Sequence, residues 1–127
     1  MHCKYLGVDQ YFYGAILKLL VYFVLADSSP LKNLQQVWGE IKIFYRDCKT
    51  PVRFKYITKL TMFQKRGDGK FPKLRGKAAE IKYLAEPMFL LWKRHMNERL
   101  EIHKTLLRAL QLNLLVEQLL LDYKDDL

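Results

Sequence analysis

Basic side chains are concentrated in the middle of this 127-residue chain. Between Lys49 and Lys82 there are eleven lysines and arginines but only two acidic residues, Asp68 and Glu80, so this segment has a net charge of +9. The rest of the chain has eleven basic and eleven acidic residues and is neutral overall. A positive charge confined to one segment favours contact with a polyanion such as nucleic acid.

Aromatic residues are interleaved with these basic side chains, namely Phe54, Tyr56, Phe63 and Phe71. Lysine and arginine neutralise phosphates, and exposed aromatic rings can stack on unpaired bases. The segment therefore predicts binding of DNA or RNA, chiefly through phosphates and with little sequence preference. The alternative is that the rings belong to the core and the lysines form a solvated rim. The predicted contact residues are Arg53, Lys55, Lys59, Lys65, Arg66, Lys70, Lys73, Arg75 and Lys77.

Two glycine-containing stretches in this segment invite comparison with phosphate-binding loops: Gly67-Asp68-Gly69-Lys70 and Arg75-Gly76-Lys77. Neither has the GxxxxGK[ST] spacing, and no predicted strand precedes them as a Walker loop requires. We instead expect Arg75-Gly76-Lys77 to begin a helix, where free backbone N–H groups would hold a phosphate of a nucleic-acid backbone.

A catalytic site needs a base beside its nucleophile or two converging carboxylates, and the sequence shows neither pattern. His95 and His103 are eight residues apart, and Asn97 between them predicts a helix break, so we expect surface or packed histidines. Cys48 lies near a helix end, where the dipole raises the pKa of a thiol. The two cysteines and three histidines lack metal-binding spacing. We therefore expect no enzyme activity, no metal site and no cofactor.

The elements that must position the basic segment begin with an apolar run at Tyr11 to Ala26. With 16 residues and Lys18 inside it, the run is shorter than the roughly 20 residues that span a bilayer. It predicts a buried first helix. We expect an intracellular protein, and the nucleus is among the expected locations. Secretion through residues 1–26 is the alternative, although Asp9 lies in the region that would precede the apolar core of a signal peptide.

A second helix is predicted from Leu31 to about Asp47, because apolar residues recur there at intervals of three and four. Asp27-Ser28-Ser29-Pro30 should end the first helix and cap the second. Thr50-Pro51 repeats this cap-then-proline signature, whereas the residues 52–57 alternate as in a strand. Because no other strand pattern is present to pair with it, we expect a short helix there. Gln64 to Lys73 should be a surface loop.

The C-terminal half predicts two further helical regions. The periodicity from Leu74 to about Asn97 is helical but interrupted by Pro87, which predicts a kink or a two-piece helix. The final stretch, from Glu98 to about Tyr123, should be the longest helix and a wall of the core, with acidic residues in its first turn. Together these elements predict an all-α, small antiparallel bundle of four to five helices with a basic loop. It would form a single domain over residues 1–127, or a fragment of a larger fold.

Leucine occurs on several faces of the last helix between Leu106 and Leu121. That is more apolar surface than one small bundle easily covers, and uncovered surface of this kind marks an interface. The alternative function is therefore a helical interaction module that needs a protein partner.

The opening Met1-His2-Cys3-Lys4-Tyr5-Leu6-Gly7-Val8 resembles the segment after an active-site aspartate in cut-and-paste transposases of the CACTA and KDZ kind. In that family an Asp-x-Met-His stretch leads into Leu-Gly, the aspartate binds metal, and the following helical region packs beside an RNase H-like core. Here the chain begins at Met1 without that aspartate, so the resemblance implies a truncated, non-catalytic piece of a mobile-element protein. His2 alone carries over from the pattern. The residues 74–80 are similar in character to helical segments in open reading frames of such elements.

Overall fold

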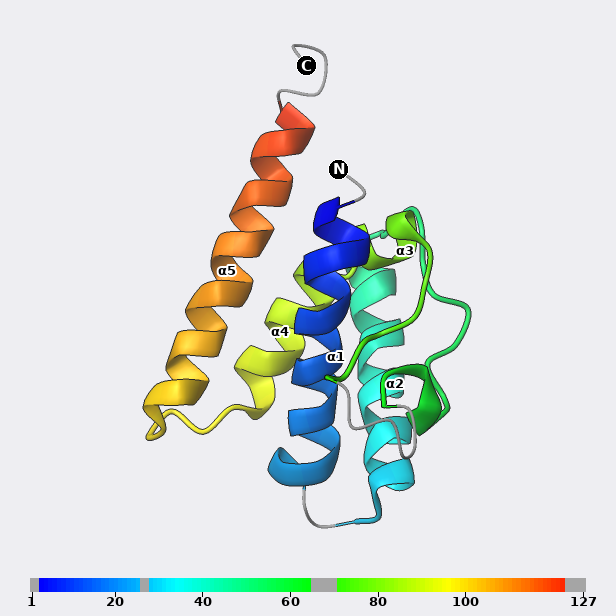
Figure 1. Ribbon diagram of the computed structural model, residues 1–127, viewed down its shortest axis with the longest axis vertical. Coiled ribbons are helices and arrows are strands. Elements are labelled where there is room, and N and C mark those ends of the chain that lie inside the picture. The colour runs from blue at the N-terminus through cyan, green and yellow to red at the C-terminus, as the bar shows by residue number, and fades with distance from the viewer. Residues whose placement is uncertain (1–2, 26–27, 65–70, 123–127) are drawn as a thin grey trace.

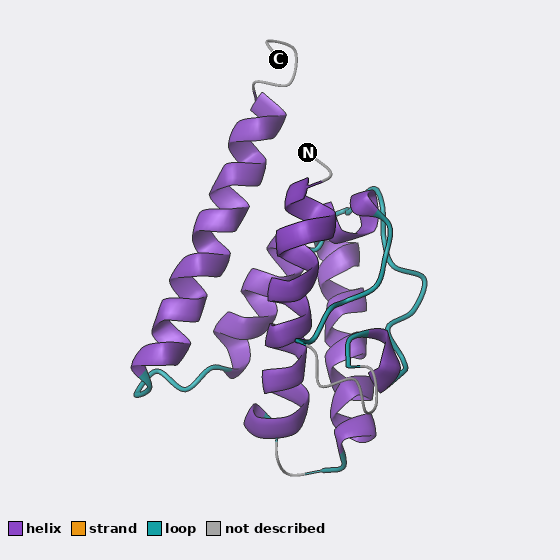
Figure 2. Cartoon of the chain, in the orientation of Figure 1, coloured by secondary structure: helices purple, strands orange, loops and turns teal. Residues whose placement is uncertain are grey.

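The computed structural model describes residues 3–25, 28–64 and 71–122, and within these ranges it contains helices and loops but no strand (Figures 1 and 2). The α-helices are α1 (Gln10–Leu19), α2 (Pro30–Asp47), α3 (Ala78–Lys82), α4 (Ala85–His95) and α5 (Glu101–Asp122). The four longer helices run alternately down and up in Figure 1, so neighbours along the chain are antiparallel. The predicted all-α antiparallel bundle is confirmed. No helix in the described ranges is long and apolar enough to cross a membrane.

α1 is the middle part of a longer helix, because a π-helical segment precedes it at Lys4–Asp9 and another follows at Leu20–Val24. The prediction that the apolar run forms a buried helix is confirmed, since Tyr13, Ile16 and Leu17 are fully buried. The first two turns were not predicted. In these turns Leu6 and Val8 are exposed whereas Asp9 and Gln10 are buried, so no apolar periodicity marks the buried face.

α2 begins as the sequence predicts. Ser29 is the N-cap, and its hydroxyl accepts a hydrogen bond of 3.3 Å from the Lys32 backbone N–H, with Pro30 as the first helical residue. The buried Asn33 side chain donates to the Val21 carbonyl at 2.8 Å and also to the Leu25 carbonyl. This amide thus ties the start of α2 to backbone carbonyls at the end of the first helix.

The helix predicted at Thr50-Pro51 is wrong, because these residues end α2 instead. Lys49 adopts a left-handed conformation with φ 53°, and the Thr50 N–H bonds the Tyr45 carbonyl at 3.0 Å. The Lys49 N–H also bonds the Arg46 carbonyl at 3.2 Å. Both bonds are those of a Schellman motif, after which proline is common, so the same residues fit a helix end as well as a start. The residues 52–59 are neither helix nor strand.

The residues 71–77 pass close to the first helix. A 3-10 turn at Leu60–Met62 is followed, after the undescribed residues 65–70, by a non-helical stretch up to Lys77. The Leu74 N–H bonds the Gln10 carbonyl at 2.9 Å, and the Gln10 side-chain amide donates to the Leu74 carbonyl at 3.0 Å. Gly14 permits this approach: a Cβ there would lie 2.8 Å from the Lys73 backbone nitrogen. Most of the predicted loop at residues 64–73 lies outside the described residues.

The predicted two-piece helix is confirmed, with its break at Tyr83 and Leu84 between α3 and α4. Pro87 is the third residue of α4, where its missing N–H would otherwise point to the Tyr83 carbonyl. The break therefore falls one turn before the proline, which lies in the first turn of α4 where a missing N–H is tolerated. The residues 74–77, predicted as the start of this helix, are not helical.

α5 is the longest described helix, with 22 residues, and begins three residues later than predicted. Glu101 lies in its first turn, whereas Glu98 precedes the helix. It forms less of the core than expected: only Leu110 and Glu117 are buried along its length. In Figure 1 it lies at the edge of the bundle, next to α4.

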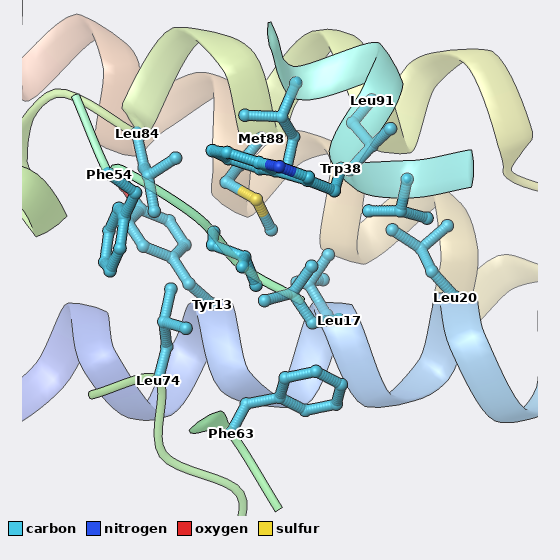
Figure 3. Packing of buried hydrophobic residues seen from close by; sticks show 14 of the residues in the cluster. Tyr13, Leu17, Leu20, Trp38, Phe54, Phe63, Leu74, Leu84, Met88 and Leu91 are labelled. Atoms are coloured by element: carbon cyan, nitrogen blue, oxygen red, sulfur yellow. The ribbon is translucent and has the colours of Figure 1, made fainter. Parts of the chain in front are cut away.

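The core lies between the first helix, α2 and α4, with contributions from the long connection after α2 (Figure 3). Trp38 of α2 and Met88 and Leu91 of α4 lie across from the first helix. The connection supplies Phe54, Phe63 and Leu74, all of them buried. The basic segment is thus anchored to the core through its apolar residues. The labelled residues of this cluster are Tyr13, Leu17, Leu20, Trp38, Phe54, Phe63, Leu74, Leu84, Met88 and Leu91.

Candidate polyanion-binding surface

Six of the nine predicted contact residues lie in the described part of the chain, and we call them the basic surface. They are Arg53, Lys55, Lys59, Lys73, Arg75 and Lys77. Five of them are exposed and Lys73 is partly buried. The remaining three, Lys65, Arg66 and Lys70, lie outside the described residues.

Backbone contacts bring the separate parts of the basic surface together. The Arg75 N–H bonds the Met62 carbonyl at 2.9 Å, and the Lys73 N–H bonds the Phe63 carbonyl at 2.9 Å. Gly76 faces the ring of Phe54, since a Cβ at Gly76 would lie 2.5 Å from Cζ of that ring. The stretch that follows the undescribed residues is therefore held beside both the 3-10 turn and the Phe54 region.

Alternation along the backbone explains why the basic side chains remain exposed. Between Lys73 and Lys77 the buried Leu74 and the tightly packed Gly76 separate the basic residues. Residues two apart in an extended chain lie on the same face, so Arg75 and Lys77 share the face opposite Leu74. Phe54 is buried between the exposed Arg53 and Lys55 in the same way.

The charges of the basic surface are not neutralised by the described acidic side chains. None of its six residues forms an ion pair with another described residue. Arg53 donates from Nε to the Thr50 carbonyl at 2.7 Å, and Lys73 Nζ lies 5.6 Å from the centroid of the Tyr11 ring. The side chains of the four other residues, Lys55, Lys59, Arg75 and Lys77, are exposed to solvent.

The interleaved aromatic residues divide into two groups. Phe54 and Phe63 are buried in the core, so neither can stack on a base, and the alternative that the rings belong to the core is confirmed for this pair. Tyr56 and Phe71 are exposed, Phe71 to 85% of its side-chain area. An aromatic contact with bases is therefore restricted to these two rings.

The expected phosphate site on free N–H groups at Arg75-Gly76-Lys77 is wrong. Lys77 is the N-cap of α3, and its backbone N–H already donates to Oε1 of Glu80 at 2.8 Å. A glutamate at the third position of the helix fills the place that a phosphate would take. Any contact between this part of the chain and a phosphate must therefore come from the basic side chains of Arg75 and Lys77.

The residues considered for catalysis have structural partners. Burial raises the pKa of the Cys48 thiol, and the nearby Glu86 carboxylate raises it further, so the direction agrees with the prediction although the causes differ. The His103 Nδ1 accepts from the Asn97 N–H at 3.0 Å, and the His103 carbonyl accepts from Trp92 Nε1 at 2.9 Å. His103 therefore shapes the turn between α4 and α5.

His95 pairs with Glu40 across the α2–α4 interface. Its Nε2 lies 2.8 Å from Oε2 of Glu40, and Arg94 Nη1 donates to Oε1 at 2.6 Å. Burial by itself would raise the pKa of Glu40, but the hydrogen bonds from Arg94 and His95 outweigh it and lower the pKa below its usual value. The cluster links two helices and contains no nucleophile.

Sequence reasoning missed a buried polar cluster between the first helix and α5. Lys4 Nζ lies 2.6 Å from Asp9 and 2.5 Å from Glu117, and the Tyr5 hydroxyl donates to Glu117 at 2.8 Å. Burial, and then the hydrogen bond to Glu117, raises the pKa of Tyr5 above its usual range. Because Lys4 and Glu117 are 113 positions apart, no local pattern could have revealed their pairing. The cluster fastens the second half of α5 to the bundle.

No grouping of three or more His, Cys, Asp or Glu side chains able to hold a metal occurs in the described ranges. His2, the residue that the transposase resemblance would carry over, lies outside these ranges. Comparison with known proteins finds no matching family model, no matching curated protein and no matching solved structure.

Proposed function

We propose that this chain binds nucleic acid through the basic surface, without catalysing a reaction. Phosphate contacts by lysine and arginine would supply most of the affinity, with little dependence on sequence. The observation that carries the proposal is the arrangement at residues 53–59 and 73–77, where buried anchors lie between basic side chains, most of them exposed. Such a surface offers several charges on a backbone that the core already holds in place, which lowers the entropic cost of binding.

Tyr56 and Phe71 extend the proposal to single strands. Both rings are exposed, and each directly follows a lysine in the sequence. Stacking of a base on such a ring is sequence-tolerant because every base has a π-face. We expect a single strand to bind at least as tightly as a duplex of the same length.

The test is a variant that removes four exposed charges without disturbing the core. K55Q/K59Q/R75Q/K77Q spares Arg53 and Lys73, whose side chains contact Thr50 and Tyr11. Each substitution is at an exposed position and should change the free energy of unfolding by no more than about 0.5 kcal/mol. We expect unchanged helical circular dichroism and a large loss of affinity for a labelled oligonucleotide at low salt, measured by fluorescence anisotropy.

The matched control is K32Q/K42Q/K93Q/R99Q, which removes the same charge from positions outside the basic surface. It should retain most of the affinity. Equal losses in both variants would show that only the net charge of the protein matters, and no binding by the wild type at low salt would refute the proposed function outright.

A second candidate function is docking of a protein partner on α5. Within the predicted range Leu106 to Leu121, Leu110 is buried and Leu106 and Leu107 are partly buried, whereas Leu112 and Leu119 are exposed to 62% and 55%. An exposed apolar strip along a helix is a common feature of protein interfaces.

A further inference from the structure

The outer face of α5 carries a continuous heptad pattern. Positions three and four apart alternate along it, and every member is exposed or partly buried. The exposed fractions are 62% for Ile102, 62% for Leu112, 42% for Val116 and 55% for Leu119. We call this set the outer seam, and its members are Ile102, Thr105, Ala109, Leu112, Val116 and Leu119.

The outer seam is distinct from the face that α5 turns to its own bundle. That inner face contains the buried Leu110 and Glu117, and Asn113, which donates to the Tyr13 hydroxyl at 2.7 Å. A surface helix normally has one apolar stripe, so a second stripe on the solvent side lacks a partner within the described residues. A helix of 22 residues is about 33 Å long, which accommodates three heptads.

We propose that the outer seam joins two copies of this chain in a parallel two-stranded coiled coil. The inference rests on the second candidate function and names the partner. Numbered as heptads, the a positions are Ile102, Ala109 and Val116, and the d positions are Thr105, Leu112 and Leu119. β-branched residues at a with leucine at d favour parallel dimers over higher oligomers, and two of the three positions of each kind follow that rule.

The flanking charges favour the parallel arrangement. In parallel register the charged g positions, Glu101, Arg108 and Asp122, lie on the opposite side of the coil from their copies, while the e positions Leu106 and Asn113 face their own bundle. No like charges meet. An antiparallel pair with full overlap would instead bring Glu101 of one copy against Asp122 of the other, and this repulsion disfavours it.

The size of the contact sets the expected strength. Within Glu101–Asp122 the a, d and g positions comprise 10 residues in each copy, and the e positions Leu106 and Asn113 are occupied by the chain's own bundle. A typical stable interface uses roughly 20–30 residues a side, so α5 alone should give a dissociation constant in the micromolar range. The dimer would place the two bundles on opposite sides of the coil, because the inner face of each α5 remains occupied by its own chain.

Sedimentation equilibrium across micromolar concentrations tests the proposal. The wild type should be a monomer–dimer mixture, and L112E/L119E should be a monomer with unchanged circular dichroism, because glutamate is a good helix former but repels its copy in the seam. L31E/I43E, which changes two exposed apolar residues of α2, should dimerise as the wild type does.

A wild type that stays monomeric, or a dimer that persists in L112E/L119E, overturns the proposal. If the wild type is a monomer, binding of a hydrophobic dye shows whether its outer seam is an open apolar surface. If the monomer binds dye and L112E/L119E does not, the outer seam is an open apolar surface, and only its pairing with a second copy is refuted. If neither binds dye, the second candidate function fails as well.

Disulfide cross-linking tests the orientation. In a C3S/C48S background, T105C lies at a d position and should form a disulfide with the same residue of the other copy on mild oxidation, since a parallel pair brings these side chains together. Failure of T105C to cross-link with itself, while an equimolar mixture of the T105C and V116C proteins forms the mixed disulfide, would show an antiparallel pair and overturn the parallel arrangement.

Discussion

Lys49 adopts a left-handed backbone conformation, with φ 53°, where α2 ends. A residue with a Cβ is less stable in this conformation than glycine, by about 1 kcal/mol. Lys49→Gly should therefore raise the free energy of unfolding by up to about 1 kcal/mol, reduced by the greater entropy of glycine in the unfolded chain. Chemical denaturation measures the effect.

Lys42→Gly is the control for this change, because it removes the same side chain and charge from the interior of α2. It should lower the free energy of unfolding by about 1 kcal/mol. Destabilisation by both substitutions would contradict the role assigned to Lys49.

Tyr45 couples the stability of the core to alkaline pH. Burial raises the pKa of Tyr45 to about 12 from its ordinary 10.0. The unfolded chain therefore ionises before the folded one, and stability present below pH 10 is lost as the pH rises toward 12. The free energy of unfolding should fall in this window with a slope that includes about 1.4 kcal/mol per pH unit from Tyr45.

Tyr45→Phe removes this contribution together with the hydrogen bond of 3.2 Å that the Phe54 N–H donates to the hydroxyl. The variant should be less stable at neutral pH but show a shallower decline above pH 10. Burial raises the pKa of Tyr13 as well, so a decline of reduced slope remains. Parallel pH profiles for the two proteins would contradict the assignment.

For single residues, the sequence predicts which side chains are exposed better than it predicts which groups they contact. Arg53, Lys55 and Arg75 are exposed as expected, because charged side chains rarely lose their hydration. The occupation of the Lys77 N–H by Glu80 was not predicted, since it depends on α3 beginning at Ala78 rather than at Leu74.

Gly14 decides whether the basic segment can pack on the first helix. A Cβ at Gly14 would lie 2.8 and 2.9 Å from the backbone nitrogens of Lys73 and Leu74, and backbone atoms cannot move aside cheaply. Gly14→Ala should therefore destabilise the fold by about 1–3 kcal/mol, the range observed for overpacked sites. Amide hydrogen exchange should rise at Leu74, whose N–H bonds the Gln10 carbonyl.

Gly39→Ala supplies the comparison, because Gly39 lies inside α2 with no atom within 4 Å of an added Cβ. It should stabilise the protein by about 1 kcal/mol through helix propensity. If Gly14→Ala behaved like Gly39→Ala, the close approach of the basic segment to α1 would be refuted.

Elements with strong apolar periodicity and clear caps were predictable. α2 and the division between α3 and α4 follow from spacing and from proline. The connection at residues 52–59 was not predictable, because its core anchors Phe54 and Ile57 are three positions apart and the alternation breaks at Tyr56, which is exposed. The uncovered face of α5 was indicated by its excess of leucine, but which leucines face outward depends on the buried pairing of Glu117 with Lys4 and Tyr5.

For the whole molecule, the two proposals reinforce one another. A parallel dimer would carry two basic surfaces on one particle, and simultaneous binding raises the apparent affinity without any new contact. L112E/L119E should therefore weaken binding to a long duplex more than to an oligonucleotide that spans one basic surface. Anisotropy with the two lengths measures the difference.

The salt dependence of nucleic-acid affinity tests the central claim most directly. For the wild type, log K should fall linearly with log salt. For K55Q/K59Q/R75Q/K77Q the slope on duplex DNA should be shallower by roughly 0.9 for each phosphate that the variant no longer neutralises. The slope for K32Q/K42Q/K93Q/R99Q should match that of the wild type. An affinity independent of salt, or the same change of slope in both variants, would contradict phosphate binding by the basic surface.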